Sequence, residues 1–219
     1  MNVPEILDSL EAHYGPQQPD WPLDPYLFIV WWHCGYPASD AACAKGWQAL
    51  QKIGTDPEQL LAATPKQLAT ALKAGGMVPE LRALRLKEIA QRIEHEFAGD
   101  LRAHLTRANL KKFSNIADPG ADRILLFAGA SPIAAVPSNC PHVLVRISRG
   151  PERENYGVNY RHSQELIETQ VPNTLEARQR AYLLLKHHGQ TLCKRTKPKC
   201  PECPLRETCR YALRSALRS

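Results

Sequence analysis

The sequence predicts an all-α protein. Three observations support this fold class: apolar residues recur at helical spacing, helix-capping patterns open several segments, and no pair of segments reads convincingly as paired strands. The 219 residues are 43% hydrophobic, which suffices for a core and allows one large or two small domains. No repeat or low-complexity segment interrupts the pattern.

The chain begins with a helical stripe of apolar residues at 3–13, followed by a proline-rich connector at 15–25. Residues 26–34 are almost wholly apolar. A buried helix and a buried strand both fit this run, and the helical surroundings favour a helix. Ser39 then supplies the N-cap of a helix over 39–51.

Two short helices follow, each opened by a capping residue and a proline, at 56–57 and 64–65, and a Gly-Gly pair at 75–76 ends the second. A long amphipathic helix is predicted over 79–97. The apolar residues expected to face the core from this helix are Leu81, Leu84, Leu86, Ile89, Ala90 and Ile93.

The second half of the chain contains predicted helices over 101–112 and 121–128 and a short apolar run at 143–147. Two further helices are predicted over 163–169 and 174–188. An N-T-L-E capping pattern opens the last of these.

Four cysteines lie close together near the end of the sequence, separated by six, two and five residues: Cys193, Cys200, Cys203 and Cys209. Four thiolates in a short run form the ligand set of a tetrahedral metal site or a four-iron cluster. Disulfides are disfavoured because the 7 cysteines are an odd number and no signal peptide is visible. Structural zinc is disfavoured because zinc ribbons pair two C-x2-C knuckles and only one is present.

Basic residues accompany the cysteines. The net charge of +6 gives a modest bias toward polyanions. Four of the cations lie between the first two cysteines of the run: Lys194, Arg195, Lys197 and Lys199. Ligation would hold this loop rigid and could direct it at a phosphate backbone, whereas a solvated cationic loop is the alternative.

The location of the protein follows from what the sequence lacks. No apolar run reaches the roughly 18 residues of a membrane span. The first 14 residues carry three acids rather than a basic-then-apolar pattern. We therefore expect a cytoplasmic protein, nucleoid-associated if bacterial, in a reducing compartment where thiolates stay free to bind metal. We also expect it to be a monomer.

The cysteine spacing resembles the cluster loop at the C-terminus of endonuclease III and MutY-type adenine glycosylases. The phrases L-L-L-K-H-H-G-Q-T-L-C at 183–193, A-T-P-K-Q-L-A-T-A-L-K-A-G-G at 63–76 and L-R-A-L-R-L-K-E-I-A at 81–90 resemble helices of that superfamily. The resemblance extends over residues 25–212. It implies a 4Fe-4S cluster on the four cysteines and double-stranded DNA as the partner.

The resemblance also implies an architecture. A six-helix helix-hairpin-helix domain, expected at 26–132, would be inserted into a cluster domain built from both chain ends, 1–25 and 133–219. DNA would lie in the groove between the two domains.

The sequence departs from the family in the hairpin. The family hairpin reads L-P-G-V-G, whose glycines allow a tight turn that points backbone amides at a phosphate. When A-D-R-I-L-L-F-A-G at 121–129 is matched to the second hairpin helix without gaps, the hairpin reads F-S-N-I-A. The glycine positions are then Asn115 and Ala117, of which Asn tolerates a left-handed conformation better.

The departure extends to the catalytic positions. Bifunctional relatives carry a nucleophilic lysine and, 18 residues later, an aspartate. Here those positions are Pro119 and Pro137, and the interval of 18 residues is kept. A second register places the hairpin at 118–122 and Ile124 at the lysine position. Neither register restores an amine or a carboxylate.

Other residues are therefore candidates for catalysis and DNA contact. Asp118 and Asp122 lie one helical turn apart and could assist hydrolysis at a pocket mouth, or could be helix-start acids favoured by the dipole. Tyr36 adjoins Pro37, which takes the place of the family's base-replacing glutamine. Tyr36 could wedge into a duplex or could be a core or rim residue.

The remaining reactive residues have simpler explanations. His33 could line a base pocket, although a satisfied core histidine is the simpler interpretation. Cys34, Cys43 and Cys140 read as small buried apolar groups, with a thiol role for Cys140 left open.

Two functions fit these expectations. The first is a divergent DNA N-glycosylase of base-excision repair that acts on an altered base without efficient AP-lyase activity. The second is a catalytically silent protein that binds damaged or distorted DNA. The sequence leaves open whether the chain is an enzyme.

Overall fold

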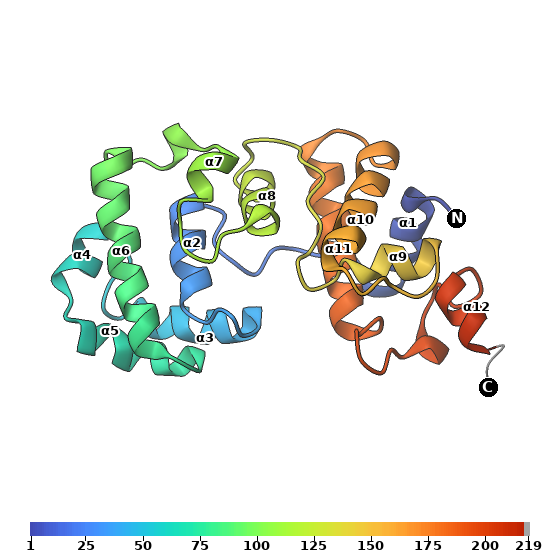
Figure 1. Ribbon diagram of the computed structural model, residues 1–219, viewed down its shortest axis with the longest axis horizontal. Coiled ribbons are helices and arrows are strands. Elements are labelled where there is room, and N and C mark those ends of the chain that lie inside the picture. The colour runs from blue at the N-terminus through green and yellow to red at the C-terminus, as the bar shows by residue number, and fades with distance from the viewer. Residues whose placement is uncertain (217–219) are drawn as a thin grey trace. The chain divides into compact units, whose positions relative to one another are not determined.

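The computed structural model describes residues 1–216, with side chains to residue 214, and every regular element in this part of the chain is helical (Figure 1). The chain divides into two compact units. We call residues 20–116 the middle unit, and residues 1–19 together with 117 onward the terminal unit. The sequence predicted domain boundaries at 25/26 and 132/133. The two units instead divide at 19/20 and 116/117, so helix α8 (Asp118–Phe127) belongs to the terminal unit rather than to the middle one.

The middle unit is a bundle packed around its longest helix, α6, which contacts α2, α4 and α5. Its helices are α2 (Pro25–His33), α3 (Asp40–Leu50), α4 (Pro57–Ala62), α5 (Pro65–Leu72), α6 (Pro79–Phe97) and α7 (Arg107–Leu110), with 3-10 turns η1 (Lys73–Gly75) and η2 (Arg102–His104). The caps predicted at Ser39 and Thr64 are confirmed, because their side chains accept hydrogen bonds from the backbone amides of Ala42 and Gln67.

The predicted inward face of α6 is partly wrong. Leu81 and Leu84 are 44% and 51% exposed, whereas Arg82 is only 1% exposed. The Arg82 guanidinium occupies a core position because it donates hydrogen bonds to the backbone oxygens of Cys34, Leu72 and Gly76. A buried cation is tolerated where carbonyl oxygens surround it, and a hydrophobic pattern cannot anticipate this.

The helix predicted over 101–112 is interrupted. Only η2 and α7 are regular there, and Leu105 between them has an extended ψ of 94°. The Thr106 side chain then starts α7 by accepting a hydrogen bond from the Asn109 amide at 3.1 Å. The competing cap explains why the apolar pattern does not produce one continuous helix.

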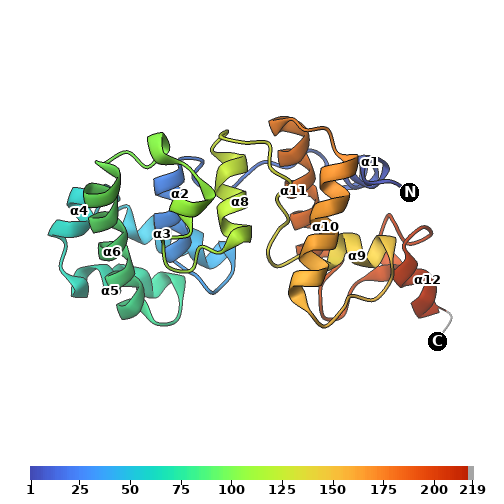
Figure 2. The same cartoon turned by 45° about the horizontal axis from the view of Figure 1, so that its top comes forward.

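The terminal unit joins the two chain ends. Its elements are α1 (Val3–Tyr14), α8, α9 (His142–Ser148), α10 (Tyr156–Gln170), α11 (Leu175–Thr191), η3 (Cys200–Glu202) and α12 (Arg210–Ala216). Helix α1 packs against α10 and α11, and α9 packs against α10, α11 and α12 (Figures 1 and 2). Arg180 on α11 forms ion pairs of 2.8 Å with both Asp8 and Glu11 on α1.

Several predicted segments of this unit are longer than expected. The apolar run at 143–147 forms α9, α10 begins at Tyr156 rather than at 163, and α8 begins at Asp118 rather than at 121. Among the described helices, none is both long and apolar enough to cross a membrane.

Candidate metal centre and nucleic-acid interface

The four clustered cysteines line one cavity in the terminal unit. Cys193 follows α11, Cys200 begins η3, Cys203 directly follows η3, and Cys209 immediately precedes α12. Cys209 is buried and the other three are half-buried, and all are free thiols, so no disulfide joins them. The end of α11, the η3 turn and the start of α12 thus bring the four thiols to the same cavity.

The donor set fits a cluster. Among residues 1–214, no group of three or more His, Cys, Asp or Glu side chains is close enough to hold a single metal ion. The four thiols border a common cavity, and four thiolates are the usual ligands of a four-iron cluster.

Burial and a neighbouring cation act on the thiols in opposite directions. Burial raises the pKa of Cys193 to about 11, against the opposing effect of the nearby Arg146 guanidinium, whose Nη1 lies 3.9 Å from Cys193 Sγ. The Cys209 thiol lies 3.6 Å from the backbone oxygen of Arg146. Because metals bind thiolates rather than thiols, metal binding at this site would release the thiol protons and would be linked to local folding.

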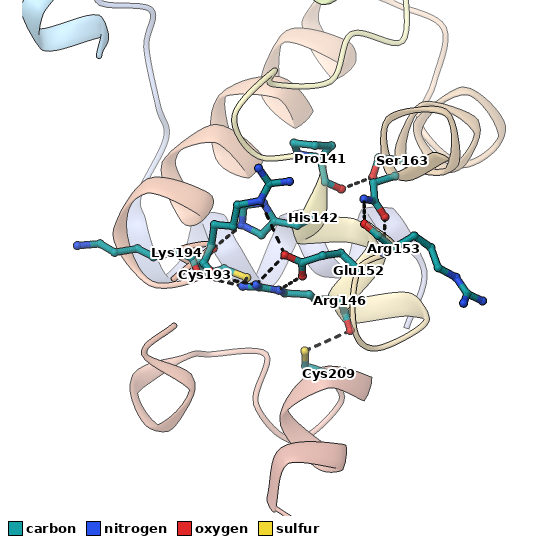
Figure 3. Close-up of polar contacts among 11 residues, drawn as sticks. Pro141, His142, Arg146, Glu152, Arg153, Ser163, Cys193, Lys194 and Cys209 are labelled. Atoms are coloured by element: carbon teal, nitrogen blue, oxygen red, sulfur yellow. Dashed lines mark hydrogen bonds and ion pairs between the residues drawn. The ribbon is translucent and has the colours of Figure 1, made fainter. Parts of the chain in front are cut away.

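Arg146 on α9 also fixes the start of the basic loop (Figure 3). Its side chain forms two hydrogen bonds with Glu152, at 2.6 and 3.0 Å. The same guanidinium donates to the backbone oxygens of Lys194 and Arg195, each at 2.9 Å. Burial alone would raise the pKa of Glu152, but the hydrogen bonds and charge of Arg146 hold it below its usual range. One buried cation thereby orders two loop residues.

The side chains of the basic loop are solvent-exposed: Lys194, Arg195, Lys197 and Lys199. Lys197 has a left-handed φ of 54°, so the loop turns sharply there. Arg195 lies 3.9 Å from Glu152, and Lys199 lies 3.5 Å from Glu202. Figure 3 shows the Lys194 side chain extending away from Arg146. Exposed cations on an anchored backbone suit contact with phosphates.

The hairpin follows the first of the two registers. Asn115 has a left-handed φ of 61°, a conformation that glycine adopts most readily. Ala117 is extended, with a φ of −93°, and needs no glycine-like freedom. The second register is wrong, because Gly120 lies inside α8 rather than in a turn.

His33 is a core residue that anchors the hairpin, so the base-pocket alternative is wrong. It is 1% exposed, and its Nδ1 lies 2.8 Å from the backbone oxygen of Ile29. Its Nε2 lies 2.9 Å from the backbone oxygen of Ser114, next to Asn115. Burial lowers the pKa of His33.

The structure separates the two candidate acids. Asp118 is exposed at the start of α8, whereas Asp122 is 1% exposed. Asp122 accepts hydrogen bonds from Tyr160 Oη at 3.1 Å and from Gln164 Nε2 at 3.5 Å. Burial and the Asp122 carboxylate both raise the pKa of Tyr160, which keeps this phenol protonated as a donor. The expectation that both acids point at a pocket mouth therefore fails for Asp122.

The two prolines expected at the family's lysine and aspartate positions carry no reactive group. Pro119 is half-buried in the first turn of α8, and Pro137 is buried before α9. Tyr36 is half-buried, and its ring stacks on Trp32 with centroids 4.9 Å apart. A wedging role for Tyr36 would have to break this stack and stays a prediction.

The three isolated cysteines are buried, as predicted. The Cys34 and Cys43 thiols lie 3.3 and 3.5 Å from the backbone oxygens of Val30 and Trp32. The Cys140 thiol lies 3.8 Å from the backbone oxygen of Lys186. Their contacts are those of small core side chains.

Sequence reasoning missed four residues around the cysteine cavity: Tyr14, Arg146, Glu152 and His188. The arginine inside the apolar run V-L-V-R-I was the available signal for a buried, partnered cation. Nothing local marks Tyr14, because its hydrogen-bond partners lie at the other end of the chain.

Known proteins share this architecture at the level of structure rather than sequence. No protein-family model matches the sequence, and no curated protein matches it significantly. Solved structures do match. Endonuclease III in a non-covalent complex with DNA aligns with a TM-score of 0.81 at 17% identity, over 100% of each chain.

Two further structures show the same architecture. A thermostable thymine-DNA glycosylase aligns with a TM-score of 0.77 at 20% identity, over 97% of each chain. The 3-methyladenine DNA glycosylase of H. pylori, bound to 1,N6-ethenoadenine, aligns with a TM-score of 0.64 at 15% identity, over 88% of this chain and 99% of its own. The chain therefore has the helix-hairpin-helix fold of endonuclease III along its whole length.

Proposed function

We propose that the chain binds double-stranded DNA and is a divergent DNA N-glycosylase of base-excision repair, acting on an altered base without efficient AP-lyase activity. The observation that carries this proposal is the full-length likeness to endonuclease III in complex with DNA. Two other proteins of the same fold are glycosylases for thymine and for 3-methyladenine.

The DNA contacts are proposed on exposed parts of each unit. In the terminal unit they are the basic-loop residues Lys194, Arg195, Lys197 and Lys199. In the middle unit they are Asn115, at the left-handed turn of the hairpin, and Tyr36, the candidate wedge. Phosphate contacts supply affinity without reading sequence, which suits a protein that scans DNA for damage.

The cofactor proposed is a 4Fe-4S cluster on Cys193, Cys200, Cys203 and Cys209. Once bound, such a cluster would supply a rigid junction for the loop and a redox couple. The chain's own contribution is to order the loop backbone through Arg146 and to keep the thiols in a partly dry cavity.

Lyase chemistry is proposed to be absent, because a lyase needs an amine that attacks the sugar aldehyde carbon. Pro119 and Pro137 supply neither that amine nor the carboxylate that stabilises a sugar cation. Base release would therefore be hydrolytic, with an acid orienting water. Asp118 is the accessible acid of the two candidates, since Asp122 is buried against Tyr160.

A second function has its own support. Asp122 is buried, and the position expected for the family's aspartate is the buried Pro137, which has no carboxylate. A protein that retains the fold and the basic loop but performs no chemistry would be a binder of damaged or distorted DNA. Release of a free base from DNA distinguishes the glycosylase from the silent binder.

The test is incubation of the holoprotein with duplexes carrying a panel of altered bases, followed by mass analysis of released bases. We expect release of at least one base, with strand scission only after alkali. Borohydride should trap little covalent adduct on abasic DNA, and Pro119→Ala should not change this. Binding to abasic DNA without any base released would support the silent binder, and robust borohydride trapping would overturn the absence of lyase chemistry.

A further inference from the structure

Behind the cysteine cavity lies a buried histidine that the proposed DNA chemistry does not use. His188, near the end of α11, is 1% exposed and lines the cavity. Its ring Nε2 lies 3.8 Å from Cys203 Sγ. Its Nδ1 lies 2.9 Å from the hydroxyl of Tyr14, the last residue of α1.

The Tyr14 ring is held from several sides. The rings of His13 and His187 meet it edge-on, each with a centroid distance of 4.6 Å. The Thr191 hydroxyl lies 3.2 Å from the Tyr14 hydroxyl and 2.8 Å from the backbone oxygen of His187. The shorter hydrogen bond of Thr191 is the one to the carbonyl, which uses the single Thr191 proton.

The direction of the hydrogen bonds follows from the chemistry of the sulfur. A cysteine sulfur bound to iron carries no proton and can only accept. A neutral imidazole has one donor and one acceptor nitrogen. If Nε2 donates to Cys203, then Nδ1 must accept, and the Tyr14 hydroxyl is the donor 2.9 Å away. Residues 174 positions apart in the sequence thereby determine one tautomer.

We propose that His188 donates a hydrogen bond to Cys203 Sγ and that Tyr14 positions it, so that the N-terminal helix tunes the reduction potential of the cluster. This inference rests on the cluster proposed above. Hydrogen bonds to the sulfurs are among the factors that set the potential of an iron–sulfur cluster. A donor stabilises the added negative charge of the reduced form, so this hydrogen bond raises the potential.

The experiment measures iron content, the midpoint potential and the Fe–S(Cys) stretching frequencies of the holoprotein. Tyr14→Phe removes only the hydroxyl and keeps the ring contacts. The midpoint potential of the cluster in Tyr14→Phe should be lower than in the wild type. At a fixed applied potential the ratio of oxidised to reduced cluster should change by up to about tenfold, which corresponds to about 59 mV for one electron. Tyr156→Phe is the matched control, because its hydroxyl donates to the backbone oxygen of Ser138 instead.

A second pair of variants guards against loss of folding. His188→Gln retains a side-chain N–H donor, so its midpoint potential should stay near the wild-type value. His188→Leu removes the donor, so its midpoint potential should fall at least as far as that of Tyr14→Phe. Equal potentials and equal Fe–S frequencies in wild type, Tyr14→Phe and His188→Leu would overturn the inference while leaving the cluster intact. A wild-type protein without iron would overturn the cluster and this inference together, while DNA binding could still be measured independently.

Discussion

The carboxylate of Asp122 and the hydroxyl of Tyr160 form a hydrogen bond of 3.1 Å between α8 and α10 in the core of the terminal unit. Because a buried donor without an acceptor is costly, Asp122→Ala should lower the free energy of unfolding by about 1–3 kcal/mol. Asp118→Ala, at an exposed helix start, should cost less than about 1 kcal/mol. Chemical denaturation of the wild type and the two variants measures this.

The same pair of variants distinguishes structure from catalysis. If Asp122→Ala retained full stability but abolished base release, Asp122 would be catalytic despite its burial. If Asp118→Ala alone abolished base release, the exposed acid would be the one that assists water.

His33 makes the middle unit sensitive to acid. Burial lowers the pKa of His33 in the folded state, so the unfolded chain binds its proton more readily. Its contribution to stability is therefore present above the unfolded pKa of about 6.5 and is lost as pH falls below that value. The unfolding midpoint should drop between pH 7.5 and 5.5.

The matched variants for this prediction are His33→Gln and His95→Gln, the latter on an exposed position of α6. His33→Gln should be less stable at neutral pH but should show a smaller drop on acidification. An unchanged drop in His33→Gln would assign the acid sensitivity to the other buried histidines, His142 and His188.

At the scale of elements, the basic loop should account for much of the salt dependence of DNA binding. Changing Lys194, Arg195 and Lys197 to Ala should flatten the slope of log K against log salt by about one unit for each phosphate interaction removed. A triple change of Lys45, Lys52 and Lys66 removes the same charge from exposed positions on and near α3 and α5. Equal slopes for the two triple variants would show that the loop faces solvent when DNA binds.

The elements themselves show where sequence patterns succeed and fail. Caps such as Thr64 are confirmed, because capping involves residues only three positions apart. The face predicted for α6 was partly wrong, because Arg82 finds carbonyl partners on a distant turn. The length of α10 was underestimated, because an Asn155 cap starts the helix at Tyr156, before the expected start at 163.

At the scale of the whole molecule, cluster binding should be linked to folding of the terminal unit. The purified protein should be yellow-brown, with about four irons per chain. Cys200→Ser should reduce iron content and solubility together, more than a weakened DNA interaction explains, because ligation orders the loop. Cys140→Ser removes a buried thiol outside the run and serves as the control.

The outcome that contradicts this prediction is a colourless wild-type protein holding one zinc. Cys200→Ser with unchanged solubility, despite loss of iron, would instead separate the cluster from the folding of the unit. Iron analysis and visible absorption distinguish both cases.

The sequence alone determined the helical class, most element positions and the run of four thiols, because spacing, capping and ligand order are local properties of the chain. It also placed the left-handed turn at Asn115 in one of two registers. Only the tertiary structure decided which acid is accessible, that His33 anchors the hairpin, and that Tyr14 reaches His188 across 174 positions. Those outcomes depend on contacts between residues far apart in the sequence. A periodic pattern of apolar residues does not predict such contacts.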